Sequence, residues 1–160
     1  MKAKIKECKA SLGHSSPYLH LESALLYLQA GMPKKAADML VSFSALNPPY
    51  QVRILKLAAD LYLVSSLKKW ASTYILYLES LDEDKLDSFE KLQIHAAASF
   101  MKKLDFISAA ASFEDAANFT CSKQRKMIYF IEAERLYEKA GLRNHAQRIY
   151  NQTLFMLYSK

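Results

Sequence analysis

The side chains in this sequence that could do chemistry are few and scattered. His95 precedes three alanines in "HAAASF" and could act as a general base, but a lone histidine on a helix more often has a structural role. The other histidines have no acidic or thiol partner at the spacing of metal ligands, and Cys8 and Cys121 form no CxxC pair. These patterns argue against an enzyme and predict neither a metal nor a cofactor.

The composition favours a helical protein. The chain has 160 residues, of which 51% are hydrophobic, and only three are glycine and four are proline, so long helices joined by short turns are expected. No apolar run is long enough for a signal peptide or a membrane span, and two distant cysteines suggest reduced thiols. We therefore expect a cytoplasmic protein without a membrane span.

A recurring pair of an aromatic residue and an alanine nine residues later organises the chain. A large side chain follows each alanine by four positions, which places it on the same helix face. The four pairs are Tyr27 with Ala36, Tyr62 with Ala71, Phe100 with Ala109, and Tyr137 with Ala146, and the large residues are Leu40, Ile75, Phe113 and Tyr150. The pattern predicts helices over 17–30, 33–46, 51–64, 68–80, 87–103, 106–118, 125–140 and 143–158.

This pattern resembles the tetratricopeptide repeat (TPR), a helix-turn-helix unit of about 34 residues. The match is best in "SPYLHLESALLYLQAGMPKKAADMLVSFSALNPPY", where Gly31 stands at the turn between the helices and Pro48 at the end of the second. The resemblance implies an all-α, TPR-like helical-repeat solenoid of about four helix-turn-helix hairpins. One domain over 17–160 would follow a basic N-terminal segment at 1–16.

The resemblance also implies a concave groove lined by the first helix of each hairpin. Carried over to this chain, the partner-binding positions are Tyr18, Leu21, Leu25, Leu28, Arg53, Lys56, Leu63, Ile94, Met101 and Arg135. Two interpretations of the leucines stand side by side: they line the groove, or they pack against a neighbouring helix or the N-terminal segment. Leu21 and Leu25 occupy the positions where chaperone-binding relatives carry polar clamp residues, which argues against that ligand.

The expected function is therefore a non-enzymatic protein–protein interaction module, acting alone or as a subunit of an assembly. An apolar groove with basic flanks suits an amphipathic helix or an extended segment that carries acidic residues. One alternative is a type III secretion chaperone, because "IHAAASFMKKLDFISAA" is similar to a repeat of those proteins. Another is an RNA-associated scaffold that uses lysine pairs at the hairpin turns, although no aromatic-basic motif for nucleic acid is present. The sequence does not predict an oligomeric state.

Overall fold

The chain is all-α wherever its structure is described. A computed structural model describes residues 18–81 and 84–159, so the predicted N-terminal segment 1–16 lies outside the described residues. Within those two ranges the chain forms eight α-helices and one short 3-10 helix, and no strand. The predicted all-α class is thus confirmed.

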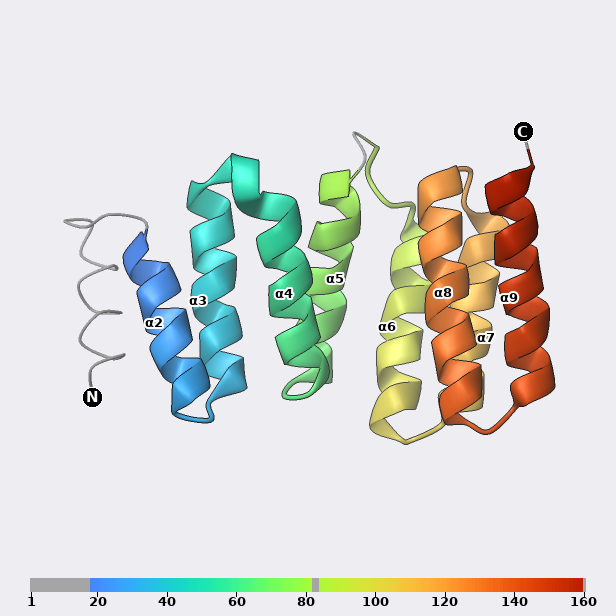
Figure 1. The fold of residues 1–160 in the computed structure, drawn as a ribbon, viewed down its shortest axis with the longest axis horizontal. Helices are drawn as coiled ribbons and strands as arrows, with labels where there is room; N and C mark the ends of the chain where they lie inside the picture. Colours follow the sequence, from blue (N-terminus) through green and yellow to red (C-terminus); the bar gives the residue numbers. More distant parts are fainter. Residues whose placement is uncertain (1–17, 82–83, 160) are drawn as a thin grey trace. The chain divides into compact units, whose positions relative to one another are not determined.

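The helices divide into two compact units that meet in sequence between Lys85 and Leu86. Unit 1 contains α2 (Tyr18–Gln29), α3 (Pro33–Leu46), the 3-10 helix η1 (Pro48–Tyr50), α4 (Gln51–Leu63) and α5 (Leu67–Leu81). Unit 2 contains α6 (Ser88–Lys102), α7 (Phe106–Phe119), α8 (Lys123–Lys139) and α9 (Arg143–Tyr158). Within each unit every α-helix packs against the next one along the chain (Figure 1). The domain predicted from the sequence spans both units.

Local side chains explain where the helices of unit 2 begin. Asp87 and Glu90 form a capping box at the start of α6, with Phe89 N donating to Asp87 Oδ1 at 2.8 Å. At α8, Ser122 Oγ accepts from Arg125 N at 3.2 Å, and the helix begins two residues earlier than the predicted start at 125.

Three of the hairpin turns share one backbone geometry. The amide five residues after the repeat aromatic donates to the carbonyl of that aromatic in each turn, a Schellman-type helix end. The bonds are Met32 N to Tyr27 O at 2.8 Å, Asp105 N to Phe100 O at 2.9 Å, and Leu142 N to Tyr137 O at 2.9 Å. The residue before the donating amide has a positive φ in all three turns: Gly31, Leu104 and Gly141. The sequence repeat therefore corresponds to a repeated turn.

The small residues of the repeat form the core, as the pattern predicts. Ala36, Ala71 and Ala109 are 0% exposed, and the smallest side chain lets neighbouring helices approach closely. The large residue four positions later is also buried in the first three hairpins. In the fourth hairpin that residue, Tyr150, is 44% exposed, because α9 is the last helix of unit 2 and no later described helix packs on it.

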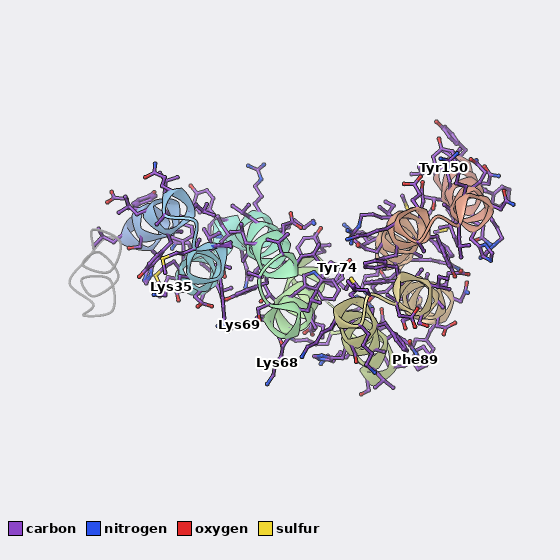
Figure 2. The ribbon with its side chains drawn as sticks, turned by 90° about the horizontal axis from the view of Figure 1, so that it is seen from below. Lys35, Lys68, Lys69, Tyr74, Phe89 and Tyr150 are labelled. Atoms are coloured by element: carbon purple, nitrogen blue, oxygen red, sulfur yellow. The ribbon has the colours of Figure 1, made fainter. Side chains whose placement is uncertain are left out.

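A polar clasp joins three successive helices of unit 1. The Tyr62 hydroxyl on α4 donates to the Asp38 carboxylate on α3, and Lys69 Nζ on α5 contacts Asp38 Oδ1 at 2.7 Å. Burial and the adjacent carboxylate raise the pKa of Tyr62 above its usual value. Lys69 is one of the lysines beside the α2–α3 and α4–α5 turns, which lie at the same end of unit 1 (Figure 1) and face the viewer in Figure 2. Part of that basic group is therefore neutralised within the fold.

A buried ionic cluster joins α6 to α8 in unit 2. Glu90 Oε1 accepts from Arg125 Nε at 3.1 Å and from the Tyr129 hydroxyl at 2.9 Å, and all three residues are buried. Burial, followed by the charge of Glu90, raises the pKa of Tyr129 far above its usual value, so the phenol stays a donor. The cluster ties α6 to α8 through side chains that lie 35 and 39 residues apart in the sequence.

Candidate interaction groove

The predicted groove residues of α2 lie on one exposed face of that helix. Tyr18 and Leu25 are each 58% exposed and Leu28 is 38% exposed, while Leu21 is partly covered. Their spacing of three or four residues places them together, opposite the buried Ser23. Leu25 and Leu28 are therefore not part of the core of unit 1. Packing of these leucines against the N-terminal segment involves residues outside the described range.

The predicted positions on α4 are partly occupied by contacts inside unit 1. Arg53 is exposed and Leu63 is half-buried. Lys56 Nζ pairs with Asp60 Oδ1 at 2.7 Å and lies 5.9 Å from the centre of the Tyr77 ring. The charge of Lys56 thus already has an acidic partner on its own helix.

The predicted positions of unit 2 separate into core and surface. Ile94 is 0% exposed and Met101 is 7% exposed, because they share the face of α6 on which Glu90 contacts α8. These two residues belong to the core of unit 2 and line no described groove. Arg135 on α8 is exposed, and its Nη2 lies 2.6 Å from Glu132 Oε2.

A groove of about 840 Å³ lies elsewhere in unit 2, over residues of α7, α8 and α9. Its volume is in the range of sites that hold small ligands or short peptide segments. It is lined by Asn118, Lys126, Phe130, Asn144, Gln147, Arg148, Asn151, Gln152, Phe155 and Met156. Lys126 and Phe130 lie one turn apart on a different face of α8 from Arg135, so this is not the predicted groove.

A row of carboxamides runs along the α9 wall of the groove. Asn144, Gln147 and Asn151 are spaced by three and four residues, so they share one face of the helix. All three are exposed, and Gln147 Nε2 donates to Asn151 Oδ1 at 3.0 Å. Each carboxamide offers both donors and an acceptor, which is the pairing that a peptide main chain requires.

A second polar clasp fixes the distance between the walls. Arg148 on α9 donates through Nη2 to Glu114 Oε1 on α7 at 2.9 Å, and the Tyr137 hydroxyl on α8 donates to the same oxygen at 2.7 Å. Burial alone would raise the pKa of Glu114, but the hydrogen bonds from Arg148 and Tyr137 outweigh it and lower the pKa. Burial and the bond to Glu114 raise the pKa of Tyr137 to about 12. The clasp is the counterpart of the one in unit 1.

The groove continues into a cavity of about 330 Å³ near the start of α8. The two spaces share Lys126, Phe155 and Met156, and the smaller one adds Lys123, Cys121, Thr120 and Ser159. None of the residues that line either space is Asp or Glu. Phe155 is 74% exposed and is the large apolar side chain most open to a ligand there.

The α8–α9 pair carries the opposite charge on its other side. A cavity of about 440 Å³ is lined there by Glu134, Glu138, Arg143, Ala146, Gln147 and Tyr150. Burial, followed by the negative charge of Glu138, raises the pKa of Glu134. The acid-free groove and this acidic cavity are therefore electrostatically distinct.

Comparison with protein-family models, with curated proteins and with solved structures gives no match to this chain. In the described ranges 18–81 and 84–159, no three His, Cys, Asp or Glu side chains are grouped as metal ligands would be. No helix within those ranges is both long and apolar enough to cross a membrane.

The sequence prediction placed the groove on the first helix of each hairpin, whereas most residues that line this groove belong to α9, the second helix of the last hairpin. One signal was present: from Lys139 to Lys160 the chain contains no Asp or Glu. Carboxamides recur at helical spacing within that stretch.

Proposed function

We propose that this protein is a non-enzymatic interaction module that holds an extended segment of a partner protein in the groove over α7, α8 and α9. The observation that carries the proposal is the carboxamide row of Asn144, Gln147 and Asn151 along a groove of about 840 Å³. Proteins recognise extended segments by pairing with the main chain and by filling adjacent side-chain pockets, and the groove offers both.

An extended segment fits the row better than a helix does. The amide and carbonyl groups of a helical ligand are already paired within the helix, whereas those of an extended chain are available to carboxamides. From Asn144 to Phe155 the wall rises by about 17 Å, which corresponds to about five residues of an extended chain. The length of this wall therefore matches a short linear segment.

The scaffold in this proposal is a TPR-like helical repeat. Two features support it: the shared turn geometry after Tyr27, Phe100 and Tyr137, and the polar clasp that recurs in both units. In each clasp a repeat tyrosine binds an acid on the preceding helix, and a cation on the following helix binds the same acid. A stack of hairpins buries a continuous core and leaves its surface available for binding.

The test is a selection of short random peptides against the full chain. Selected peptides are expected to lose binding to Asn151→Arg, which places a long charged side chain in the groove. They are expected to bind Ser99→Arg normally, because Ser99 is exposed on α6 and does not line the groove. Failure to select any peptide, or equal loss in both variants, would reject the groove as a peptide site.

RNA binding is a weaker use of the same surface. Single-stranded nucleic acid is held by successive aromatic side chains on which bases stack. The groove has two aromatic residues, and Phe130 is only 3% exposed while Phe155 is 74% exposed. No feature of the described residues favours a secretion chaperone over a general interaction module.

A further inference from the structure

The cations of the groove differ in whether their charge is already neutralised. Arg148 uses both terminal nitrogens on Glu114, with Nη2–Oε1 at 2.9 Å and Nη1–Oε2 at 3.3 Å. By contrast, no carboxylate among residues 18–81 and 84–159 pairs with Lys123 or Lys126. The uncompensated positive charge of the groove is therefore concentrated at the start of α8.

The backbone adds to this charge. Lys123 is the first residue of α8 and Lys126 lies within its first turn, where the helix dipole places partial positive charge. Acidic side chains are favoured at such positions, yet the first turn of α8 contains none. An anionic group from outside the described chain would be stabilised by both lysines and by the helix end.

Apolar surface adjoins the two lysines. Phe155 follows Asn151 by one helical turn, and Phe155 and Met156 line both the groove and the smaller cavity together with Lys126. A ligand that follows the carboxamide row therefore reaches an apolar contact and a cationic pair at the same end of the groove.

We infer that the segment held in this groove is acidic, and this inference rests on the function proposed above. Its main chain pairs with the carboxamides of α9, and an apolar side chain packs on Phe155 and Met156. An Asp or Glu within a residue or two of that side chain binds Lys123 and Lys126. The cavity lined by Glu134 and Glu138 contains only one cation, Arg143, so its lining is net negative and less favourable for an acidic segment than the groove is.

A phosphate backbone would also satisfy the lysines, but the observations favour a peptide. Carboxamides at a spacing of three and four residues suit a main chain with regularly placed amides and carbonyls. One well-exposed aromatic ring offers no series of stacking sites for bases. The experiment must therefore include a nucleic-acid probe that can reveal RNA binding.

The experiment uses the full chain and peptides obtained from the random selection, each synthesised in three versions. The first version keeps every acidic residue of the peptide, the second replaces each of them by glutamine, and the third replaces each of them by lysine. The acidic version is expected to bind about tenfold more tightly than the glutamine version at low salt, with a smaller difference at high salt. Equal affinity of the acidic and glutamine versions would overturn the inference and leave the proposed function standing.

Two variants on one helix provide the matched comparison. Lys126→Glu is expected to bind the acidic peptide about tenfold more weakly than the wild type does, and to bind the lysine version more tightly. Arg135→Glu makes the same charge change on another face of α8, outside the groove, and is expected to change affinity less than about twofold. The reversal of preference shows that the variant is folded, and its absence would count against the inference.

A labelled oligouridylate serves as the nucleic-acid probe. If it binds more tightly than the acidic peptides and loses binding in Lys126→Glu, the ligand is RNA and the inference is wrong. If it binds more weakly than they do, the peptide assignment stands.

Discussion

Replacement of Leu104 by glycine is expected to stabilise unit 2. Leu104 has φ 61° and is the only residue other than glycine with a positive φ in the described parts of the chain. A left-handed conformation costs a residue with a side chain about 1–2 kcal/mol. Glycine loses about 0.5–1 kcal/mol more backbone entropy on folding, so the net gain is about 0–1.5 kcal/mol. Little packing is lost, because Leu104 is 74% exposed.

The matched control is Gly141→Ala at the corresponding turn of the last hairpin. Gly141 has φ 80°, and a Cβ there meets no atom within 4 Å, so its cost is that of the backbone alone. The expected loss is about 1 kcal/mol. Urea unfolding followed by circular dichroism measures both changes through the midpoint at constant slope. A lower midpoint for Leu104→Gly, or an unchanged one for Gly141→Ala, would refute the assignment of a left-handed residue to this repeated turn.

Three further predictions address the core, a clasp and the apolar face of α2. Ala109→Leu is expected to destabilise the protein by about 1–3 kcal/mol because Ala109 is 0% exposed, and Lys103→Ala on the surface should stay within about 0.5 kcal/mol. Similar urea midpoints for the two variants would show that Ala109 has been assigned to the wrong face of its helix. Since the pKa of Glu114 is lowered from 4.5, its stabilisation is present above that pH and lost as pH falls through the folded-state value. The difference in unfolding free energy between wild type and Glu114→Gln should therefore shrink on acidification, and a constant difference would contradict the role of the carboxylate. Leu25→Glu should leave helicity nearly unchanged because Leu25 is 58% exposed, and it should weaken a partner held on that face by about 2 kcal/mol. Loss of the circular dichroism signal would instead place Leu25 in the core.

The helices were predictable because their signals are local. Apolar spacing, Pro33 near the start of α3 and Gly141 before α9 locate elements from neighbouring residues alone, and α3 and α9 have the predicted bounds. Most positions of the aromatic-alanine pattern are core positions, among them Tyr27 and Ala36. Two positions differ: Phe100 is only part-buried, and Tyr150 is exposed because the pattern cannot tell whether a further helix follows to bury it.

The groove was not predictable because it depends on three helices at once. Periodicity shows which residues of one helix share a face, but it does not show where packed helices leave a hollow. The predicted surface position of Ile94 rested on the family groove, whereas the contact of Glu90 with α8 turns that face of α6 inward. In the same way, the sequence around Asn151 marks it only as polar, and its place in a groove depends on Asn118 of α7 and Lys126 of α8.

The residues of the two clasps hold the helices together, whereas other residues of the groove would contact a ligand. Tyr62 with Asp38 and Tyr137 with Glu114 recur in the two units, so these pairs belong to the scaffold. Arg148 takes part in the second clasp and also lines the groove, so its bond to Glu114 holds α9 at a set distance from α7 before any ligand arrives. A preorganised groove loses less entropy on binding. Asn151 and Lys126 line the groove but take no part in a clasp. Substitution of either residue should therefore change binding without changing the fold.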